Sequence, residues 1–475
     1  MNLLLFPNQL FHLEYLPKNI TKIYLIEHPL FFGKREKQYK FNKLKLILHC
    51  ASMQNYKELL QKKGFSIQYV SYHDFSYQKF PKTNVNCFEV NDHLLEKELK
   101  KYNSKINFLP SPNFLLSMQD LDEYHEKNKS KKLVKHQDFY IFVRNKLNIL
   151  KNSKTYDAEN RKKIPSGTNI PSLPKVQKNK FITNATHYVN KHFSENYGST
   201  NLLYPICHIE SKKWFQDFLK NKLQKFGEYQ DAIVGKEDFL FHSVISPMLN
   251  IGLLSPKHIV QEIEKYYSDN KSKIGINNYE GFIRQIIGWR EYQRYCYHFY
   301  YKEMTTSNIF GNSRCLNSKW YNGSLGIKPV DDAIKMAFEY GYLHHILRLM
   351  IMTNFMNLCG IQPKEVYRWF MEFSVDSYDW VMIQNVYSMG MWADGGLTMR
   401  KPYISADNYV LNMSNYTCKE NWCPIWKSLY YVFLEKHQTI LRSTPYGRNL
   451  AVWSKKSKEE KAKMLKLGQE FLKTI

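Results

Sequence analysis

The sequence predicts an N-terminal α/β domain built on a parallel sheet, followed by a large all-helical domain. Residues 1 to about 110 alternate short β-rich runs with helical stretches, the pattern of a parallel sheet flanked by helices. From about residue 180 onward this alternation fades, and long segments with the 3.6-residue period of a helix dominate. The length of 475 residues, against ~150 for one domain, agrees with two or three units.

The expected elements of the α/β domain are short apolar strands separated by helices. The strands are expected at 3–6, 22–27, 66–72, 84–90 and 106–109, and the helices at 43–63 and 93–102. Such a domain often binds a nucleotide through a glycine-rich turn, but the first 130 residues hold only Gly33 and Gly64. Neither a G-x-G-x-x-G fingerprint nor a P-loop can be written, which argues against an NAD-dependent dehydrogenase or a P-loop ATPase.

A basic connector is predicted between the two domains. Residues 125–163 carry twelve Lys or Arg against four Asp or Glu, and residues 164–175 are rich in Pro, Ser and Gly. We therefore expect the α/β domain in residues 1–125, the connector in 126–185 and the helical domain in 186–475. Its helices are expected at 209–225, 237–251, 256–268, 279–301, 330–358, 363–373 and 425–438, with a solvated helix at 454–467.

Composition limits the class of protein. Lys and Arg outnumber Asp and Glu by 68 to 43, a net charge of +25 that favours nucleic acid or an anionic membrane as partner, although a lysine-rich codon bias leaves the same trace. Aromatic residues make up 15%, which excludes a mainly disordered chain. No run approaches the ~18 to 20 apolar residues of a spanning helix. The N-terminal stretch is broken by Pro7 and Asn8 and has no basic start, so it is expected to form a core strand of a cytoplasmic protein rather than a secretion signal. The eight cysteines are scattered and expected to be mostly buried thiols.

Three windows, 279–295, 341–358 and 375–396, carry unusual chemistry for helices of a plain core. In a helix over 341–358, His345, Leu349 and Met352 share one face, and His344 and Arg348 form a neighbouring i, i+4 pair. Two histidines, a cation and an apolar wall can then meet at one pocket. The alternative is a buried helix whose histidines are only hydrogen-bonded. No further His, Cys or carboxylate stands nearby at a familiar ligand spacing, so no metal site is expected.

Several motifs in the right order resemble the photolyase/cryptochrome superfamily. They are FLFHSVISPMLNIGLLSP (239–256), EGFIRQIIGWREY (280–292), GYLHHILRLM (341–350), D-x-x-x-W-V-x-x-x-N (376–385), ADGG (393–396) and YDAENRK (156–162). The resemblance is greatest to the bacterial branch of prokaryotic (6-4) photolyases, also called iron–sulfur bacterial cryptochromes and photolyases. It implies the photolyase/cryptochrome fold, with an α/β antenna domain and a helical domain that holds FAD.

The resemblance also implies which residues surround FAD. The segment at the flavin diphosphate holds hydroxyls and amides at a helix start, which suit an anion, or else form an ordinary helix cap. Arg348 and Asp376 resemble the charged pair near the isoalloxazine, although a structural salt bridge leaves the same trace. Met382 matches the position that faces flavin N5, where several relatives have an acid. The FAD-contacting residues are expected to be His242, Ser243, Ser246, Gln285, Arg290, Arg348, Asp376, Met382, Asn385 and Asp394.

The implied chemistry is light-driven repair of UV-damaged DNA. Excited reduced flavin donates an electron to a (6-4) lesion flipped out of the duplex, with proton transfer from a histidine. His345 is the expected lesion-facing donor and His344 supports it, because imidazole titrates near neutral pH. Leu349 stands in the lesion pocket where animal relatives carry another histidine. A monomer is the expectation from the family.

The family regenerates reduced flavin through buried aromatic residues. Trp369 is the best candidate for the first step of this electron relay, and Phe370 and Tyr321 stand at the next positions, where relatives often carry Tyr and Trp. The path can instead involve Trp320 or Trp380. Without the resemblance, each of these residues would be interpreted as core.

The sequence departs from the family at the iron–sulfur cluster. The [4Fe–4S] relatives need four cysteine thiolates, and Pro329 stands where the first is expected. Downstream, Cys418 and Cys423 remain, while Cys315 or Cys359 can in principle substitute. Because proline cannot ligate iron, we expect that the cluster is absent.

The antenna is the least defined part of the resemblance. Relatives bind 6,7-dimethyl-8-ribityllumazine in the α/β domain, and Gln9 and Glu27, each beside an expected strand, are the candidate contacts. Either residue can equally be a polar residue at a loop end, and the antenna site can be empty. Some members of the bacterial branch also require a divalent cation.

Three other functions remain open on sequence alone. A cyclobutane-dimer photolyase is the nearest, and the His345/Leu349 pattern argues against it. A cryptochrome-like blue-light receptor shares the flavin fold without repair, so the fold does not separate the two. A basic helical nucleic-acid-binding protein without flavin would stay colourless after saturation with FAD.

Overall fold

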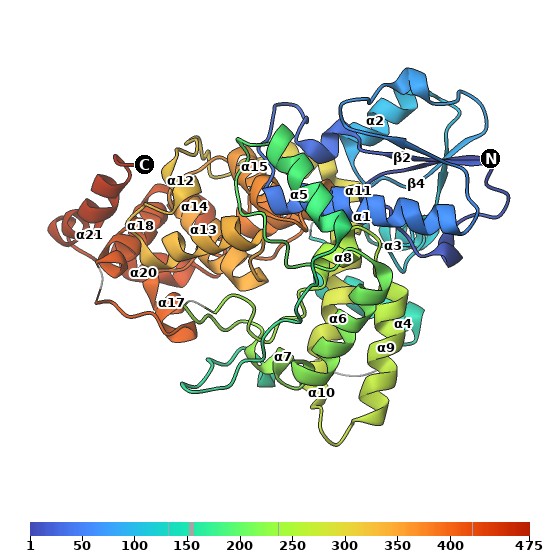
Figure 1. The fold of residues 1–475 in the computed structure, drawn as a ribbon. Coiled ribbons are helices and arrows are strands. Elements are labelled where there is room, and N and C mark those ends of the chain that lie inside the picture. The colour runs from blue at the N-terminus through green and yellow to red at the C-terminus, as the bar shows by residue number, and fades with distance from the viewer. Residues whose placement is uncertain (132, 152–155, 236, 420) are drawn as a thin grey trace.

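A computed structural model describes residues 1–475 except 132, 152–155, 236 and 420. Its N-terminal part is a five-stranded, all-parallel sheet in the order β3-β2-β1-β4-β5 (Figure 1). The strands are β1 (Asn2–Leu5), β2 (Lys22–Ile26), β3 (Ile67–Val70), β4 (Val85–Phe88) and β5 (Asn107–Leu109). The helices that follow them are α1 (Lys43–Lys62), α2 (His93–Tyr102) and α3 (Met118–Asn128). The predicted parallel α/β domain is confirmed.

The strands form because they are apolar on both faces. Leu3, Leu4 and Leu5 of β1 are fully buried, and β1 pairs with β2 on one side and β4 on the other. A parallel sheet covered on both sides requires such continuous apolar runs. The strand order reverses between β1 and β4, and the crevice at such a point is where open α/β sheets usually bind ligands.

Helices make up the rest of the chain, as predicted, and the two termini lie at opposite ends of the molecule (Figure 1). None of the described helices combines the length and apolar character needed to cross a bilayer. The α-helices are α4 (His136–Leu147), α5 (Lys180–His192), α6 (His208–Asn221), α7 (Leu223–Tyr229), α8 (Ser246–Asn250), α9 (Pro256–Asp269), α10 (Ile276–Ile283), α11 (Glu291–Thr306), α12 (Lys319–Asn322), α13 (Lys328–Tyr340), α14 (Asn354–Leu358), α15 (Pro363–Phe373), α16 (Asp379–Ile383), α17 (Asp407–Met413), α18 (Trp422–Lys436), α19 (Gln438–Leu441), α20 (Gly447–Ser454) and α21 (Lys458–Phe471).

Shorter helices of other types complete the chain. Single 3₁₀ turns are η1 (Leu13–Tyr15), η2 (Pro29–Phe32), η3 (Tyr77–Lys79) and η4 (Asp157–Glu159). Three segments are π-helical: η5 (Arg284–Arg290), η6 (Leu347–Thr353) and η7 (Gln384–Gly390). All three π segments fall in the windows singled out by sequence, and such segments are frequent at functional sites.

Two long helices expected from periodicity are wrong in part. Of 237–251, only α8 is helical, because Leu240 and Val244 adopt positive φ angles of 40° and 51°. The segment 330–358 breaks at Gly341, whose φ of 61° ends α13, and residues 342–344 are not helical. His344 therefore precedes the helix instead of lying within it. Apolar periodicity does not reveal where a helix ends when the residues on both sides of that end stay buried.

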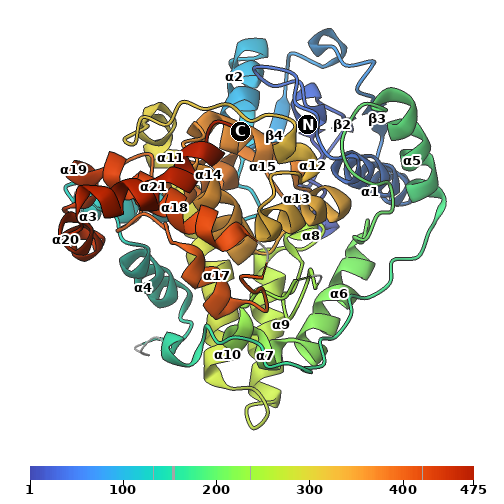
Figure 2. The same ribbon diagram turned by 90° about the vertical axis from the view of Figure 1, so that its left-hand side faces the viewer.

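The predicted connector makes contacts at both ends. Helix α4 packs on η5 of the helical region, whereas α5 packs on α1 beside the sheet. Between them, residues 156–179 hold only the 3₁₀ turn η4 and pass along the outside of the helical region (Figure 2). Residues 132 and 152–155 of the basic stretch lie outside the described residues. The boundaries at 125 and 185 stay predictions.

A buried arginine joins the two domains. The guanidinium of Arg35 contacts Asp92 at the start of α2 at 2.8 Å and Asp379 at the start of α16 at 3.3 Å. Tyr297 also donates to Asp379 at 2.5 Å, so the carboxylate has donors besides the arginine. Burial and the nearby Asp92 raise the pKa of Asp379. Two buried acids thus share one cation at the domain interface.

We expect Arg35→Met to lower the free energy of unfolding by about 3–5 kcal/mol, because both carboxylates then stay buried without a cation. Urea denaturation at pH 7 measures the loss. Lys34→Met removes an exposed positive charge from the neighbouring position and should leave the midpoint unchanged. Equal losses in the two variants would show that the contribution is one of net charge only.

Candidate functional site

The buried carboxylate of Asp376 lies at the centre of the predicted site. Arg348 of η6 donates to both of its oxygens at 3.0 Å, as the sequence predicted for this pair. Ser246 at the start of α8 donates at 2.6 Å, and Ser374 also donates. Burial opposes ionisation, yet Arg348 and the two hydroxyls hold the pKa of Asp376 below its usual value. The site therefore holds a stable, fully bonded anion.

Arg290 is buried next to this centre with one unpaired group. Its Nε donates to the carbonyl of Asn113 at 3.0 Å and its Nη1 to Oδ1 of Asn250 at 2.5 Å, but Nη2 has no partner among the described residues. The guanidinium lies 5.3 Å from the ring of Phe114 and 4.8 Å from that of Trp380. Burial lowers its pKa to about 9. A buried cation with a free N–H group is a ready donor for a polar ligand.

Asn250 connects Arg290 with the central carboxylate. Its side-chain amide donates to the backbone carbonyl of Asp376 at 2.7 Å, while its oxygen accepts from Arg290. Sequence reasoning did not select Asn250, although it lies inside the motif 239–256. An Asn directly after the apolar residues Met248 and Leu249 is the signal that could have drawn attention to it.

The segment before α8 is strained. Leu240 and Val244 have positive φ angles and flank His242 and Ser243. Left-handed backbone is a genuine outlier for a β-branched residue such as valine, and such strain costs about 1–3 kcal/mol. The indole of Trp214 donates to the carbonyl of Ser243 at 2.9 Å and so helps to hold this conformation. Strained segments of this kind cluster at ligand-binding sites.

His242 and His344 stack on each other. Their ring centroids are 4.5 Å apart and their planes differ by 12°. Burial is the main cause that lowers the pKa of both rings, that of His242 to about 3, so both are neutral at pH 7. Nε2 of His242 and Nδ1 of His344 have no partner among the described residues. The sequence had placed His242 at the flavin diphosphate and did not predict this stacking.

A buried lysine acts on the stacked rings. Lys222, between α6 and α7, is 2% exposed, and its Nζ has no hydrogen-bond partner among the described residues. Burial lowers its pKa to about 8, and its positive charge lowers the pKa of His242 further. Sequence reasoning missed Lys222 because it stands among Lys220 and Lys225 and looks like part of a solvated face.

His345 differs from His344 in being exposed. Even so, the surrounding protein and the charge of Arg348 lower its pKa to about 4. Leu349, one turn further, is buried. The predicted shared face is only partly formed, because the chain is π-helical from Leu347 onward.

The other predicted cofactor residues bond to their own segments. Gln285 donates to the carbonyl of Gly281 at 3.1 Å, and Asn385 to that of Val381 at 2.9 Å. Asp394 accepts from Ser388 and from the backbone of Gly396, and burial raises its pKa. None of these three side chains forms a hydrogen bond with Asp376 in the described part of the chain. Gln384, which the sequence did not select, is buried, and its Oε1 has no partner among the described residues.

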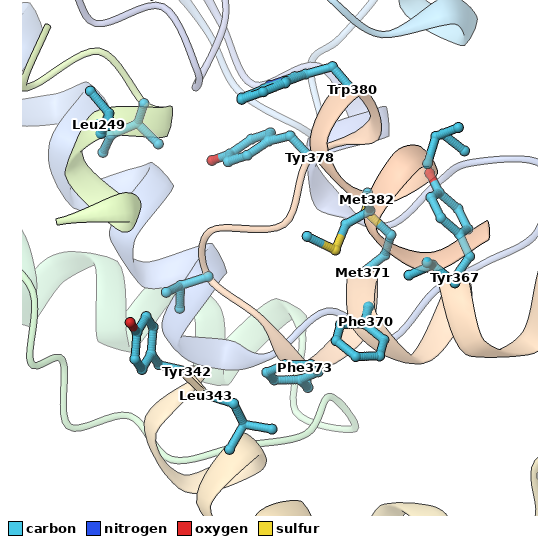
Figure 3. Close-up of a cluster of buried hydrophobic side chains, with 14 of the residues drawn as sticks. Leu249, Tyr342, Leu343, Tyr367, Phe370, Met371, Phe373, Tyr378, Trp380 and Met382 are labelled. Carbon is cyan, nitrogen blue, oxygen red and sulfur yellow. The ribbon is translucent and has the colours of Figure 1, made fainter. Parts of the chain in front are cut away.

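Met382 lies in an apolar cluster beside the charged centre. Figure 3 shows its thioether pointing from α16 into the middle of a group that includes Tyr378, Phe370 and Phe373. All four side chains are buried. A thioether neither donates nor accepts a proton under these conditions, so any proton for a group bound here has to come from elsewhere.

Aromatic rings extend from this cluster toward the surface. Trp369 is fully buried and lies 4.5 Å from Phe373 and 5.9 Å from Phe338. Phe338 lies 5.7 Å from Tyr321, which stacks on the half-buried Tyr197 at 4.9 Å. The sequence expected Phe370 to follow Trp369. Phe370 does touch Trp369, at 5.3 Å, but the aromatic contacts lead from Trp369 to Tyr321 through Phe338.

Two of the eight cysteines differ from the expectation of reduced thiols. Cys418 and Cys423 form a disulfide, so that expectation is wrong for this pair. Cys418 precedes α18 and Cys423 lies in its first turn, and their Cα atoms are 5.6 Å apart, a distance that suits a disulfide. Pro329 is buried in the first turn of α13, a favourable position for proline. The absence of an iron–sulfur cluster stays a prediction.

The two residues expected at the antenna are bonded within the chain. Gln9 donates to the carbonyl of Phe88 at 3.0 Å and so bridges the ends of β1 and β4. Glu27 accepts from Tyr69, from the backbone of Tyr72 at 2.8 Å and from Tyr188 at 3.3 Å, and burial raises its pKa. Both side chains thus have hydrogen bonds within the chain, and their role as contacts to a lumazine antenna stays a prediction.

Comparison with known proteins identifies relatives along most of the chain. The family model described as deoxyribodipyrimidine photo-lyase-related protein matches residues 3–203. A protein named (6-4) photolyase from Agrobacterium fabrum is 32% identical over 356 residues, which cover 71% of this chain and 70% of that protein.

Two solved structures share the fold at 16% sequence identity. The match to the cryptochrome of Synechocystis sp. PCC6803 has a TM-score of 0.58 and covers 98% of this chain and 93% of the cryptochrome chain. The match to a bacterial class III photolyase from Agrobacterium tumefaciens has a TM-score of 0.52 and covers 93% of this chain and 86% of the photolyase chain. With the sequence relative, these matches mean that the chain belongs to the photolyase/cryptochrome superfamily.

Proposed function

We propose that this chain is a light-driven DNA photolyase that binds FAD and reverses pyrimidine–pyrimidone (6-4) photoproducts in UV-damaged DNA. The observation that carries the proposal is the open position of His345 beside the buried, neutral His344 and the Arg348–Asp376 pair. Identity of 32% to a protein named (6-4) photolyase supports it. The net charge of +25 suits a polyanionic partner.

The unpaired buried donors fit a cofactor with negative charge. We assign the free N–H group of Arg290 and the strained backbone at Ser243 to binding FAD, with Arg348 and Asp376 near its ring system. When bound, FAD supplies the light absorption and electron transfer of the reaction. Met382 is assigned to the ring system, with Gln285, Asn385 and Asp394 as further contacts. No divalent cation is assigned to the site.

The protein's own chemical contribution is a proton at His345. A proton donor has to be protonated, but the pKa of about 4 leaves His345 neutral in the free protein at pH 7. The phosphates of bound DNA bring negative charge that opposes both burial and Arg348, and so raise this pKa. DNA binding would then load the proton at the imidazole that faces the lesion, and Leu349 would form the apolar wall beside it.

The buried cluster directs this proton to one ring. Lys222 and burial keep the pKa of His242 far below 7, and burial with neighbouring positive charges does the same for His344. Of the three histidines, His345 is the exposed one, so the charge of bound DNA reaches it most directly. Lys222 and His242 are positioning residues in this proposal, because they act through the proton on His345.

A cryptochrome-like blue-light receptor is the second candidate function. It is favoured by the likeness to a cryptochrome structure, which has the higher of the two TM-scores. A cyclobutane-dimer photolyase is the nearest enzyme alternative. Both functions are less well supported, because neither requires an exposed histidine such as His345 beside the buried His242 and His344.

The decisive measurement is a repair assay on two duplexes that carry one (6-4) lesion or one cyclobutane dimer. We expect FAD-loaded, reduced protein to restore only the (6-4) duplex, and only in light. His345→Ala should lower this rate by about 10²–10⁴-fold, the usual contribution of acid–base catalysis. The wild-type rate should fall as pH rises through the pKa of His345 in the complex.

Several outcomes would change the assignment. FAD content and duplex affinity of His345→Ala should match those of the wild type, which separates a lost proton donor from a misfolded site. Restoration of the dimer would contradict the substrate assignment. A flavin-loaded protein that repairs neither duplex in light would put the receptor first.

We expect Lys222→Met to stabilise the protein by about 1–3 kcal/mol at pH 7, because it removes a buried cation without a hydrogen-bond partner. The pKa of Lys222 is about 8 in the fold against 10.5 as its ordinary value, so its cost is present below pH 8 and disappears as pH rises through 10.5. Urea unfolding between pH 6 and pH 10 measures the difference.

The matched control is Lys220→Met, which removes an exposed charge from the end of α6, two residues before Lys222, and should change neither the stability nor the pKa of His242. Nuclear magnetic resonance should detect a raised pKa of His242 in Lys222→Met only. A destabilised Lys222→Met variant would mean that Lys222 has a bound partner in solution.

We further propose that Trp369 begins the electron relay, with Tyr321 nearer the surface. Trp369→Phe should slow the light-driven reduction of bound flavin by an external thiol at least tenfold, because phenylalanine is much harder to oxidise. Phe370→Leu, which alters a ring beside the path, should retain the rate. Equal slowing in both variants would return Phe370 to the path that the sequence predicted.

A further inference from the structure

A second cavity lies between the α/β domain and the helical region. Its volume is about 530 Å³, and it shares no lining residue with the site around Asp376. Residues 12, 14 and 15 form one wall, the loop 252–254 another, and the starts of α6 and α9 the rest. These two helices lie side by side (Figure 1). The hydroxyl groups of Tyr15 and Ser255 join two walls at 2.9 Å.

The described lining of this cavity is cationic. Lys212 of α6 and Lys257 of α9 bring two positive charges, and Glu14 is the one acid. Glu14 lies 3.2 Å from the ring of His12, so this single acid offsets at most one of the two lysine charges. Neither Lys212 nor Lys257 forms an ion pair with another described residue, and the field in the cavity favours an anion.

Two helix N-termini add to this field. Helix α6 begins at His208 and α9 at Pro256, each is 14 residues long, and the first turn of each lines the cavity. Cys207, which precedes α6, provides no side-chain cap. The partial positive charge at a helix N-terminus and its free N–H groups attract anions. At α9 the hydroxyl of Ser255 already accepts from the N–H group of His258, so the free N–H groups come from the start of α6, beside the two lysines in a half-open cavity.

Two histidines of the cavity, His208 and His258, can couple anion binding to the uptake of protons. Burial, His12 and Lys212 lower the pKa of His208 to about 4, and a hydrogen bond of 2.9 Å joins its Nε2 to the carbonyl of Leu10. Because a carbonyl only accepts, Nε2 carries the proton and Nδ1 is free to gain one.

His258 responds in the same way. Burial and Lys212 lower its pKa, His12 acts in the same direction, and Glu262 and Glu14 oppose them. An anion among these groups offsets both burial and the lysine charge. Its binding therefore raises the pKa of both histidines, and the complex takes up protons.

A metal ion does not suit this cavity. Among the described residues, one group of three His, Cys, Asp or Glu has ligand atoms within 4.8 Å of one another, and it is Asp407 with Cys418 and Cys423. The histidines of the cavity are therefore too dispersed to chelate an ion, and the two lysines repel it.

We propose that this cavity binds a phosphate-bearing ligand the size of a nucleotide, with its phosphate at Lys212, Lys257 and the two helix starts. The volume of about 530 Å³ lies within the range of small-molecule sites, about 300–1,000 Å³, and exceeds what a lone phosphate fills. The proposal is independent of the repair function, because the two sites share no residue.

Calorimetric titration of the full-length protein tests the proposal, with the flavin site filled with FAD and unbound FAD removed, because free FAD is itself a nucleotide and would compete for the cavity. The probes are inorganic phosphate, AMP and ADP. We expect saturable binding of one nucleotide, tighter than phosphate and at least threefold tighter at pH 6.5 than at pH 7.5. Proton uptake should appear as a dependence of the heat on the buffer.

Lys212→Met with Lys257→Met should weaken nucleotide binding at least tenfold. Lys213→Met is the matched control, because it removes an exposed charge of α6 that does not line the cavity, and it should retain the affinity. If the double variant does not fold, the exposed Lys257→Met alone still gives the comparison.

Three results would overturn the proposal. They are no binding at 5 mM nucleotide, equal weakening by Lys213→Met, or loss of duplex DNA binding in the double variant without any loss of nucleotide binding. The last result would assign the lysines to the DNA backbone.

Discussion

Buried in the middle of the helical region, the carboxylate of Asp376 needs donors for both oxygens and receives them from three segments. Arg348 binds both oxygens from η6, Ser246 reaches it from α8, and Ser374 adds a third donor. An ionised carboxylate taken out of water without such donors would cost several kcal/mol. The carboxylate therefore fixes α8, with the strained loop before it, relative to the segment that carries His344 and His345.

The unpaired buried groups around this carboxylate have a common meaning. Nη2 of Arg290, Nζ of Lys222, Nε2 of His242 and Nδ1 of His344 are buried without hydrogen bonds among the described residues. Native proteins satisfy nearly all buried polar groups, and each exception costs about 1–3 kcal/mol. Several exceptions together, beside a strained loop, indicate a site whose polar groups are completed by a ligand.

Charge is distributed differently in the two sites of the molecule. Around Asp376 it is balanced by a close ion pair, and the neighbouring histidines stay neutral because they are buried. In the cavity at Lys212 and Lys257, two lysine charges stand against a single lining acid, Glu14. Basic residues thus have two different surroundings in this molecule. At Asp376 the charge of an arginine is neutralised by a carboxylate, whereas in the cavity the lysine charges exceed the acidic charge and favour an anion.

Local sequence determined much of this protein. Alternating apolar runs predicted the five parallel strands and α1, α2 and α15 closely, because each pattern reports only on neighbours along the chain. The motifs identified the superfamily and the Arg348–Asp376 pair. The tertiary structure alone decided that Lys222 is buried, that His242 stacks on His344, and that Phe338 links Trp369 with Tyr321. These contacts join segments far apart in the chain, and packing in three dimensions, which periodicity does not encode, brings them together.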